Sequence, residues 1–365
     1  MLRISQLKLP VEHTEAQLKK KLLKTAHIKE QDLKQFFIRK RSVDGRKKPE
    51  LYYVYTVDLI VANEEHVKKI SKGKLQTVQE KNYHIPEHGA KKLRKRPVVI
   101  GSGPAGLFCA YLLAFEGYEP LVIERGAPVR ERQKVVEQFW KDGILNTASN
   151  VQFGEGGAGT FSDGKLNTLV KDKFGRNRFV LETFVKFGAP EEILWESKPH
   201  IGTDILIEVV ERMREEIIRL GGEFLFHSQV TDILPKENCL IVNGCHRIET
   251  DAAVFAVGHS ARDTFQMLFD RNVAMKSKSF AIGVRAEHRQ DMIDEAMYGR
   301  KERGPLGAAA YKLTAQLENG RGVYTFCMCP GGYVVNASSE QGRLAVNGMS
   351  YHDRAGENAN SAVIV

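Results

Sequence analysis

The sequence predicts an α/β protein in which a small α/β domain precedes a larger doubly wound parallel sheet with an added antiparallel part. From Pro97 onward, short apolar strands alternate with helical patterns. Charge also divides the 365-residue chain, because residues 1–96 hold 24 Lys and Arg against 11 Asp and Glu, whereas the rest holds 30 against 34. Such an asymmetry indicates a domain boundary.

The N-terminal part reads as one small basic α/β domain. The run Leu2–Leu9 is typical of a strand, and Thr14 with Gln17 forms a capping-box pattern at the start of a helix. Aromatic and β-branched runs at 36–41 and 51–57 flank a polar turn, which predicts a hairpin.

Strands and helices then alternate as a parallel sheet requires. We predict strands at 98–100, 121–123, 223–226, 229–233 and 252–258, helices at 104–114, 129–144 and 205–220, and a hairpin across Asn243 and Gly244.

The first strand leads into a glycine-rich turn that predicts a dinucleotide site. Gly101 permits the tight turn, Gly103 lets a pyrophosphate approach the backbone, and Gly106 allows close packing of helix on strand. Glu124, 18 residues after Gly106, ends the next strand and is placed to accept hydrogen bonds from ribose hydroxyls. The predicted phosphate-binding residues are Gly101, Ser102, Gly103, Pro104, Ala105 and Gly106.

Two further signals favour FAD as the dinucleotide. Glu124 is followed by Arg125 and a glycine, which resembles the ending typical of FAD-binding folds. An apolar strand that ends with Ala256 and Gly258 resembles the flavin-proximal strand of glutathione-reductase-like proteins, and the stretch around Val230 resembles their adenine-contacting strand.

The segment 154–166 is too rich in glycine for ordinary packing. Its backbone N–H groups are suited to an anion-binding nest or to contact with an isoalloxazine ring, and a plain surface loop is the alternative. The cofactor contacts predicted here are Gly157, Gly159, Thr160 and Lys165.

These motifs together resemble the uncharacterised FAD-dependent dehydrogenases, also called NAD(FAD)-utilising dehydrogenases. The resemblance implies FAD-dependent oxidoreduction by hydride transfer through the bound flavin. Members of this group are longer, so the chain is expected to continue past Val365. The stretches that carry the resemblance are 101–106 with Glu124, GGAGTFSDGKL at 156–166, AVGHSARDTF at 256–265 and Ser350-Tyr351-His352-Asp353.

The resemblance also implies a domain plan. The basic domain is expected at 1–90 and a linker at 91–97. A glutathione-reductase-like FAD-binding Rossmann-type domain follows at 98–265, with an inserted α+β substrate or cap region at 266–350 and the start of a return to the FAD domain at 351–365.

The redox partners are not visible in the sequence. No second dinucleotide fingerprint follows a strand, so NAD(P)H is a candidate reductant only at a composite site. His259, Asp163 and Lys165 are candidate catalytic residues, although a helix-start role for His259 and an exposed loop pair for the other two are alternatives. Cys327 and Cys329 share a strand face, where the thiols either meet or pack as small apolar groups.

Cys239, Cys245 and His246 superficially suggest a metal site. A two-residue turn at Asn243 and Gly244 places Cys239 opposite Ile248, away from the other two, so we predict no metal.

The basic excess of the first domain is expected to form a solvated face. Nucleic-acid binding, with bases stacked on aromatic side chains, and docking to an acidic protein are the alternatives. The alternative functions are an FAD-dependent tRNA-modifying flavoprotein and a non-catalytic FAD-binding module whose N-terminal domain binds nucleic acid or protein. No membrane span or signal peptide is recognisable, so a cytoplasmic location is expected.

Overall fold

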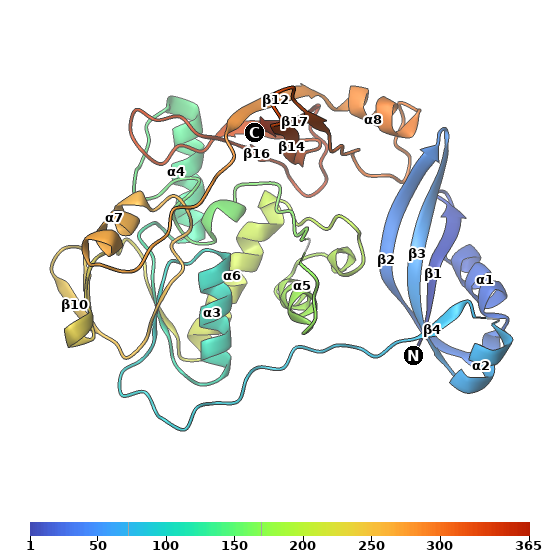
Figure 1. The fold of residues 1–365 in the computed structure, drawn as a ribbon, viewed down its shortest axis with the longest axis horizontal. Coiled ribbons are helices and arrows are strands. Elements are labelled where there is room, and N and C mark those ends of the chain that lie inside the picture. The colour runs from blue at the N-terminus through green and yellow to red at the C-terminus, as the bar shows by residue number, and fades with distance from the viewer. Residues whose placement is uncertain (72, 169) are drawn as a thin grey trace.

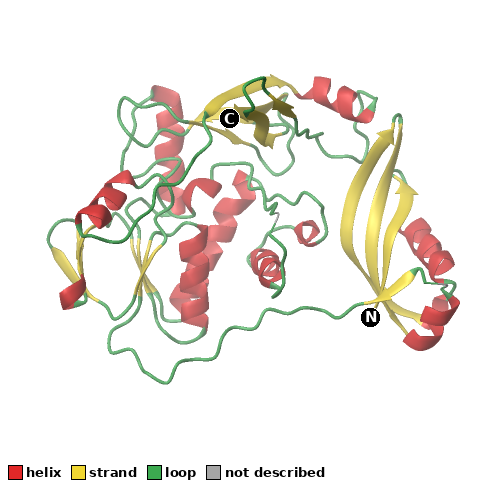
Figure 2. Ribbon diagram, viewed as in Figure 1, coloured by secondary structure: helices red, strands yellow, loops and turns green. Residues whose placement is uncertain are grey.

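The computed structural model describes residues 1–71, 73–168 and 170–365. Figure 1 shows three regions, namely an N-terminal sheet with two helices, a central region of helices around a parallel sheet, and a C-terminal antiparallel sheet that crosses the top of the view. Strands and helices alternate in the central region, whereas the outer regions are mainly strands (Figure 2). Across the described ranges, no helix combines the length and apolarity that a membrane crossing requires.

The N-terminal region is a four-stranded antiparallel sheet. Its elements are β1 (Leu2–Pro10), α1 (Glu15–Ala26), β2 (Leu33–Lys47), β3 (Glu50–Val61), α2 (Glu64–Ile70) and β4 (Leu75–Thr77). The strand order is β2-β3-β1-β4, and both helices lie on the face turned away from the central region (Figure 1). The predicted capping box is confirmed, because Gln17 N–H donates to Thr14 Oγ1 at 3.3 Å and Thr14 N–H donates to Gln17 Oε1 at 2.8 Å.

The N-terminal sheet is fastened to both other regions. Arg41 N–H donates to Trp195 O at 2.7 Å, and Ser197 N–H donates to Arg41 O at 2.9 Å. Leu306 is buried in the apolar core of the N-terminal sheet, and Tyr53 Oη donates to Pro305 O at 3.0 Å. Removal of residues 1–90 would therefore expose apolar surface on the remainder.

The central region contains a four-stranded parallel sheet. Its elements are β5 (Val98–Ile100), α3 (Pro104–Phe115), β6 (Leu121–Ile123), α4 (Val129–Asp142), α5 (Arg176–Lys186), α6 (Thr203–Arg219), β7 (Glu223–Leu225), β11 (Ala253–Phe255) and α7 (Arg262–Asp270). The strand order is β11-β5-β6-β7. Because side chains alternate along a strand, Val99 and Val122 pack with α3 and α6, whereas Val98, Ile100 and Ile123 pack on the opposite face.

That opposite face is covered by a small antiparallel sheet of β8 (Val230–Leu234), β9 (Cys239–Val242) and β10 (His246–Glu249). The predicted hairpin register is wrong by one residue, because Val242 pairs with His246 and Cys239 lies opposite Glu249 rather than Ile248. Asn243 and Gly244 both have positive φ, and Cys245 joins them in a three-residue loop. Hydrogen bonds to Gln229 hold Asn243 out of the β9–β10 ladder.

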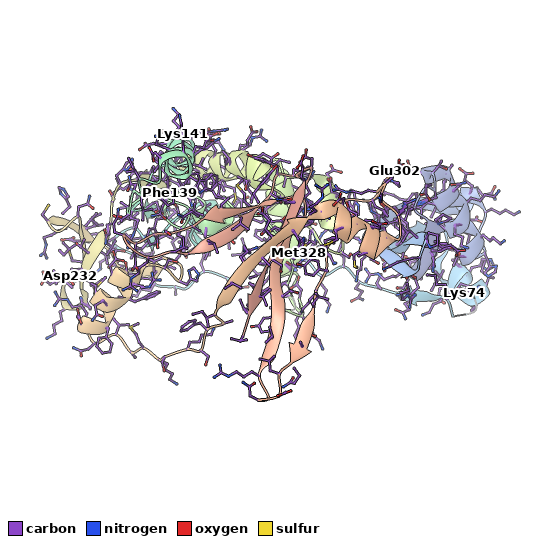
Figure 3. The ribbon with its side chains drawn as sticks, turned by 90° about the horizontal axis from the view of Figure 1, so that it is seen from above. Lys74, Phe139, Lys141, Asp232, Glu302 and Met328 are labelled. Carbon is purple, nitrogen blue, oxygen red and sulfur yellow. The ribbon has the colours of Figure 1, made fainter. Side chains whose placement is uncertain are left out.

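The C-terminal region is antiparallel. Its elements are β12 (Gly283–Arg289), α8 (Gln290–Tyr298), β13 (Thr314–Gln316), β14 (Gly322–Cys329), β15 (Tyr333–Asn336), β16 (Val346–Met349) and β17 (Asn358–Ile364). The main sheet has the order β12-β17-β14-β13, and β15 pairs with β16. Figure 3 shows Met328, in β14, between the hairpin marked by Asp232 and the N-terminal region marked by Lys74.

Two expected boundaries are corrected by this topology. Residues 351–365 do not return to the parallel sheet. Instead, β17 pairs with β12 on one side and with β14 on the other, so its backbone N–H and C=O groups are taken up within the C-terminal sheet. The expected boundary at 265 also falls inside a helix, since α7 continues to Asp270.

Candidate functional site

A cavity of about 430 Å³ opens at the carboxyl ends of β5, β6 and β11, where α3 begins. Ligands of open α/β sheets bind at this edge, where the strand order reverses. Of the residues predicted for cofactor or catalysis, those lining the cavity are Gly101, Gly103, Pro104, Ala105, Glu124, Arg125, Gly157, Gly159, Val230, Ala256, Gly258 and His259.

The glycines of the first turn differ in what surrounds them. A Cβ on Gly106 would lie 1.9 Å from Gly101 O, so this position sets the close packing of α3 on β5. Gly101 has φ +99°, and its Cβ would lie 2.6 Å from Ala256 O. At Gly103, by contrast, the nearest described atom is Gly157 Cα at 3.8 Å.

Gly103 lines the cavity beside the start of α3. Among the described residues, no side chain caps this helix end at Gly103, and Pro104 occupies its first turn. The first N–H groups of a helix and its positive dipole end attract anions. The turn therefore fits a phosphate group with its backbone alone.

Glu124 ties together the loops around the cavity. Its Oε2 accepts hydrogen bonds from Ser102 N–H at 2.8 Å and Ser102 Oγ at 2.9 Å. Its Oε1 accepts from Gly126 N–H at 2.9 Å and Gly154 N–H at 3.1 Å. Ser102 thus lies behind the cavity wall as a partner of Glu124. The predicted ribose contact of Glu124 would have to share oxygens that already accept four bonds.

Arg125 fastens the start of α7 to the end of β6. Its guanidinium donates to both Asp263 oxygens at 3.0 and 2.9 Å and to Thr264 Oγ1 at 2.9 Å, and it lies 4.4 Å from the centroid of the Phe153 ring. Burial raises the pKa of Asp263, but the hydrogen bonds and charge of Arg125 outweigh it, so the pKa lies below its usual value. Neither Phe153 nor Asp263 has a sequence signal for this role.

A buried arginine donates hydrogen bonds to the backbone at the start of the glycine-rich segment. Arg132 is fully buried, and it donates to the carbonyl oxygens of Asn150 at 2.9 Å, Val151 at 2.9 Å and Glu155 at 2.6 Å. Burial lowers the pKa of Arg132 to about 10, against the opposing charges of Glu124 and Glu155. The sequence does contain a signal, because Arg132 shares the buried stripe of α4 with apolar residues.

Glu155 lies beside this arginine. Its Oε1 is 2.8 Å from Arg214 Nε, and its Oε2 accepts from Val129 N–H at 2.6 Å. Burial raises the pKa of Glu155 to about 7, although Arg214 and the Val129 N–H oppose the shift. Because the folded-state pKa exceeds the ordinary 4.5, the folded chain keeps a proton that the unfolded chain has lost.

This shift predicts a loss of stability as pH rises. The contribution of Glu155 is full below pH 4.5 and is lost as pH rises toward 7. Glu155→Gln should therefore be stabilised relative to the wild type at about pH 8 by at most about 3 kcal/mol, with little difference at about pH 4. Urea unfolding at both values measures this, with Glu137→Gln on the exposed face of α4 as control. If the free energies of unfolding of the wild type and of Glu155→Gln changed with pH in parallel, the raised pKa of Glu155 would be contradicted.

Asp163 and Lys165 form a second cluster, outside the lining of the cavity. Asp163 Oδ1 accepts from Ser350 Oγ at 2.5 Å and Arg354 Nε at 3.1 Å, and Lys165 Nζ lies 3.2 Å from its Oδ2. Burial raises the pKa of Asp163, but the charges of Arg354 and Lys165 outweigh it and hold the pKa at about 2. The exposed loop pair that we considered for these residues is wrong, because Asp163 is buried.

The remaining predicted residues occupy different settings. Thr160 is buried, and its hydroxyl finds no hydrogen-bond partner within the described ranges. His259 is exposed at the cavity, and its Nδ1 lies 2.8 Å from Ser260 Oγ. The helix-start alternative is wrong, because α7 begins at Arg262 and its N-cap is Ala261. The part of His259 in catalysis remains a prediction.

Several basic side chains of the N-terminal sheet are paired with acids. Burial raises the pKa of Asp58, but Arg3 and Arg39 outweigh it and keep the carboxyl ionised. The paired cations near the aromatic residues are Arg39 with Asp58, Arg41 with Glu196 and Arg46 with Asp44. These pairs reduce the positive charge available to an anionic partner, and nucleic-acid binding remains a prediction. In the described part of the chain, no group of three or more His, Cys, Asp or Glu is placed to hold a metal ion.

Comparison with known families gives three matches. Residues 279–365 match the family described as FAD-dependent protein, C-terminal domain-like. Residues 99–129 match an NAD(P)-binding Rossmann-like domain, and residues 1–60 match a domain of unknown function. These matches support a flavin-linked function for the chain.

An uncharacterised protein of Clostridium beijerinckii is 48% identical over 375 residues, which cover 100% of this chain and 69% of that protein. Among solved structures, FAD-bound OTEMO is 16% identical with a TM-score of 0.27, over 46% of this chain and 26% of OTEMO. Thermovibrio ammonificans THI4 is 17% identical with a TM-score of 0.32, over 49% of this chain and 64% of THI4. The structural overlaps are too low to carry an argument.

Proposed function

Since this chain belongs to the same family as the uncharacterised protein of Clostridium beijerinckii, and its C-terminal part matches FAD-dependent proteins, we propose that it is an FAD-dependent oxidoreductase. The observation that carries the proposal is the cavity at the start of α3, which Gly103 lines. FAD supplies two-electron hydride chemistry when bound. The redox partner that exchanges electrons with the flavin is a small molecule or a protein.

The protein's part is to hold the nucleotide half of the cofactor. The N–H groups at the start of α3 would bind the pyrophosphate on the side of the cavity that Gly103 and Gly157 line. Val230, which lines the cavity together with Ala256, would contact the adenosine. Glu124 would keep Ser102 and Gly154 in position and take a ribose hydroxyl as an additional donor.

Binding tests separate this proposal from a chain that holds no dinucleotide. The purified protein should bind one FAD per chain with flavin absorption bands that remain after gel filtration. ADP should displace FAD, and FMN should bind on the order of a hundredfold more weakly, because it lacks the adenosine half that fills the cavity. Equal affinity for FMN and FAD would contradict the assignment of the cavity.

A titration under anaerobic conditions tests the electron donor. We propose NAD(P)H as reductant, so NADH or NADPH should bleach the flavin bands of the loaded protein. Bleaching by dithionite but by neither nicotinamide would restrict the proposal to FAD binding and reject the NAD(P)H link.

A further inference from the structure

Cys327 and Cys329 lie at a distortion near the end of β14. The pairing of β14 with β17 shifts between Phe326 and Cys329, so the strand contains a β-bulge. Cys327 within it has φ +47°, in the left-handed region that non-glycine residues rarely adopt. Bulges redirect side chains, and strained backbone of this kind is concentrated at functional sites.

Positive groups surround the two thiols. Lys165 Nζ lies 3.4 Å from Cys329 Sγ. Arg285 Nη1 lies 3.2 Å from Cys327 O and donates to Asn360 Oδ1 at 2.5 Å. Asn360 is fully buried, and its Nδ2 lacks a hydrogen-bond partner among the described residues. A buried unpaired donor is costly and calls for an acceptor that the folded chain does not itself provide.

The space around Cys329 is closely confined. A Cβ on Gly348 would lie 2.4 Å from Asn360 Oδ1 and 2.6 Å from both Arg285 Nη1 and Cys329 Sγ. The sulfur, the guanidinium and the amide therefore converge on one point of the C-terminal sheet. Cys329 is buried, whereas Cys327 is partly exposed.

The charges facing the pair favour a thiolate. Lys165 and Arg285 supply positive charge, and Asp163, already held by Arg354 and Lys165, is the negative group that faces the pair. The Cys329 thiol donates to the Cys327 carbonyl oxygen at 3.4 Å. The nearby Cys329 thiol lowers the pKa of Cys327, and Lys165 and Arg285 add to the shift against the effect of burial. The closeness of Cys327, together with burial, raises the pKa of Cys329.

We propose that Cys327 and Cys329 form a thiol–disulfide exchange site that reduces disulfide substrates. The Cys327 thiolate attacks one sulfur of the substrate disulfide, forms a mixed disulfide and releases the first thiolate. Cys329 then loses its proton and attacks the Cys327 sulfur, which forms the Cys327–Cys329 disulfide and releases the second thiolate. Two electrons pass from the protein thiols to the substrate, and their two protons leave with the products.

This site goes beyond the proposed flavin chemistry. The exchange consumes the two protein thiols and one disulfide and needs no cofactor, so it can be tested on protein with or without FAD. Failure of FAD binding would leave it standing, and failure of the exchange would leave the dinucleotide site standing.

The aromatic disulfide dithiobis(nitrobenzoate) serves as the probe, in a Cys245→Ser background that removes the exposed thiol. The tryptic peptide 322–343 contains both cysteines. We expect each chain to release two coloured thiolates rapidly. The mass of the peptide should fall by two hydrogens, as formation of the Cys327–Cys329 disulfide requires, and the peptide should carry no aromatic adduct. Cys329→Ser should stop at the aromatic adduct on Cys327, and Cys327→Ser should lose the fast phase. A wild-type peptide that stays reduced, or that reacts no faster than Cys109, would overturn the proposal.

Lys165→Gln tests the positioning of the thiolate independently of the cysteines. We expect the rate of adduct formation near neutral pH to fall about tenfold and its pH midpoint to move upward, because the favourable charge is lost. Lys171→Gln, at an exposed position soon after the same segment, should change neither. An unchanged pH midpoint in Lys165→Gln would show that Lys165 does not support the thiolate.

Discussion

Gly103→Val should reduce FAD affinity by more than about a hundredfold while leaving the stability of the folded chain nearly unchanged. The nearest described atom to a Cβ at this position is Gly157 Cα at 3.8 Å, which is ordinary van der Waals contact. The Cβ is therefore accommodated by the fold, and we expect the branched side chain to narrow the cavity where we place the pyrophosphate. Flavin content after loading with FAD, together with urea unfolding without FAD, measures both parts of the expectation.

Two other glycines provide matched controls. Gly106→Ala places a Cβ 1.9 Å from Gly101 O, so it should damage folding as well as binding. Gly307 lies in open space in the described structure, so Gly307→Val should leave both folding and flavin binding unchanged. Normal flavin content in a folded Gly103→Val protein would refute the placement of the pyrophosphate at the start of α3.

The features predicted correctly from sequence depend on short spacings. The capping box at Thr14 and Gln17 and the turn at 101–106 each involve groups within a few residues of one another. Their geometry is fixed by local backbone conformation, so residue types in the right order are sufficient. For the same reason, the helices at 104–114 and 205–220 were predicted to within two residues of the observed ends.

The missed features depend on long-range contacts. Asp163 meets Arg354 across 191 residues, and the position of β17 in the C-terminal sheet is decided by its pairing with β12 and β14. The prediction of the hairpin register was wrong although the residues involved are closer in sequence. The turn residue Asn243 accepts a hydrogen bond from Gln229 N–H on a neighbouring segment. Tertiary hydrogen bonds of this kind override the turn preference of an Asn-Gly pair.

The proposed dinucleotide site therefore combines a predictable turn with an unpredicted support. The turn lines the cavity at Gly103 and supplies backbone donors at the start of α3. The segment facing it, 154–159, lies on the buried guanidinium of Arg132 and on the carboxylate of Glu124. Glycine-rich backbone has little packing of its own, so these two side chains must determine its shape.

Arg132→Met should destabilise the folded chain by about 3–5 kcal/mol and reduce FAD affinity as well. The substitution leaves the carbonyl groups of Asn150, Val151 and Glu155 without their donor and removes the positive charge that faces Glu124. Urea unfolding and flavin content measure the two losses. Arg130→Met, on the exposed face of the same helix, should lose only the surface ion pairs with Glu208 and Glu211 and stay within about 1 kcal/mol of the wild type. Equal stability of the two variants would show that the glycine-rich segment holds its conformation without the buried guanidinium.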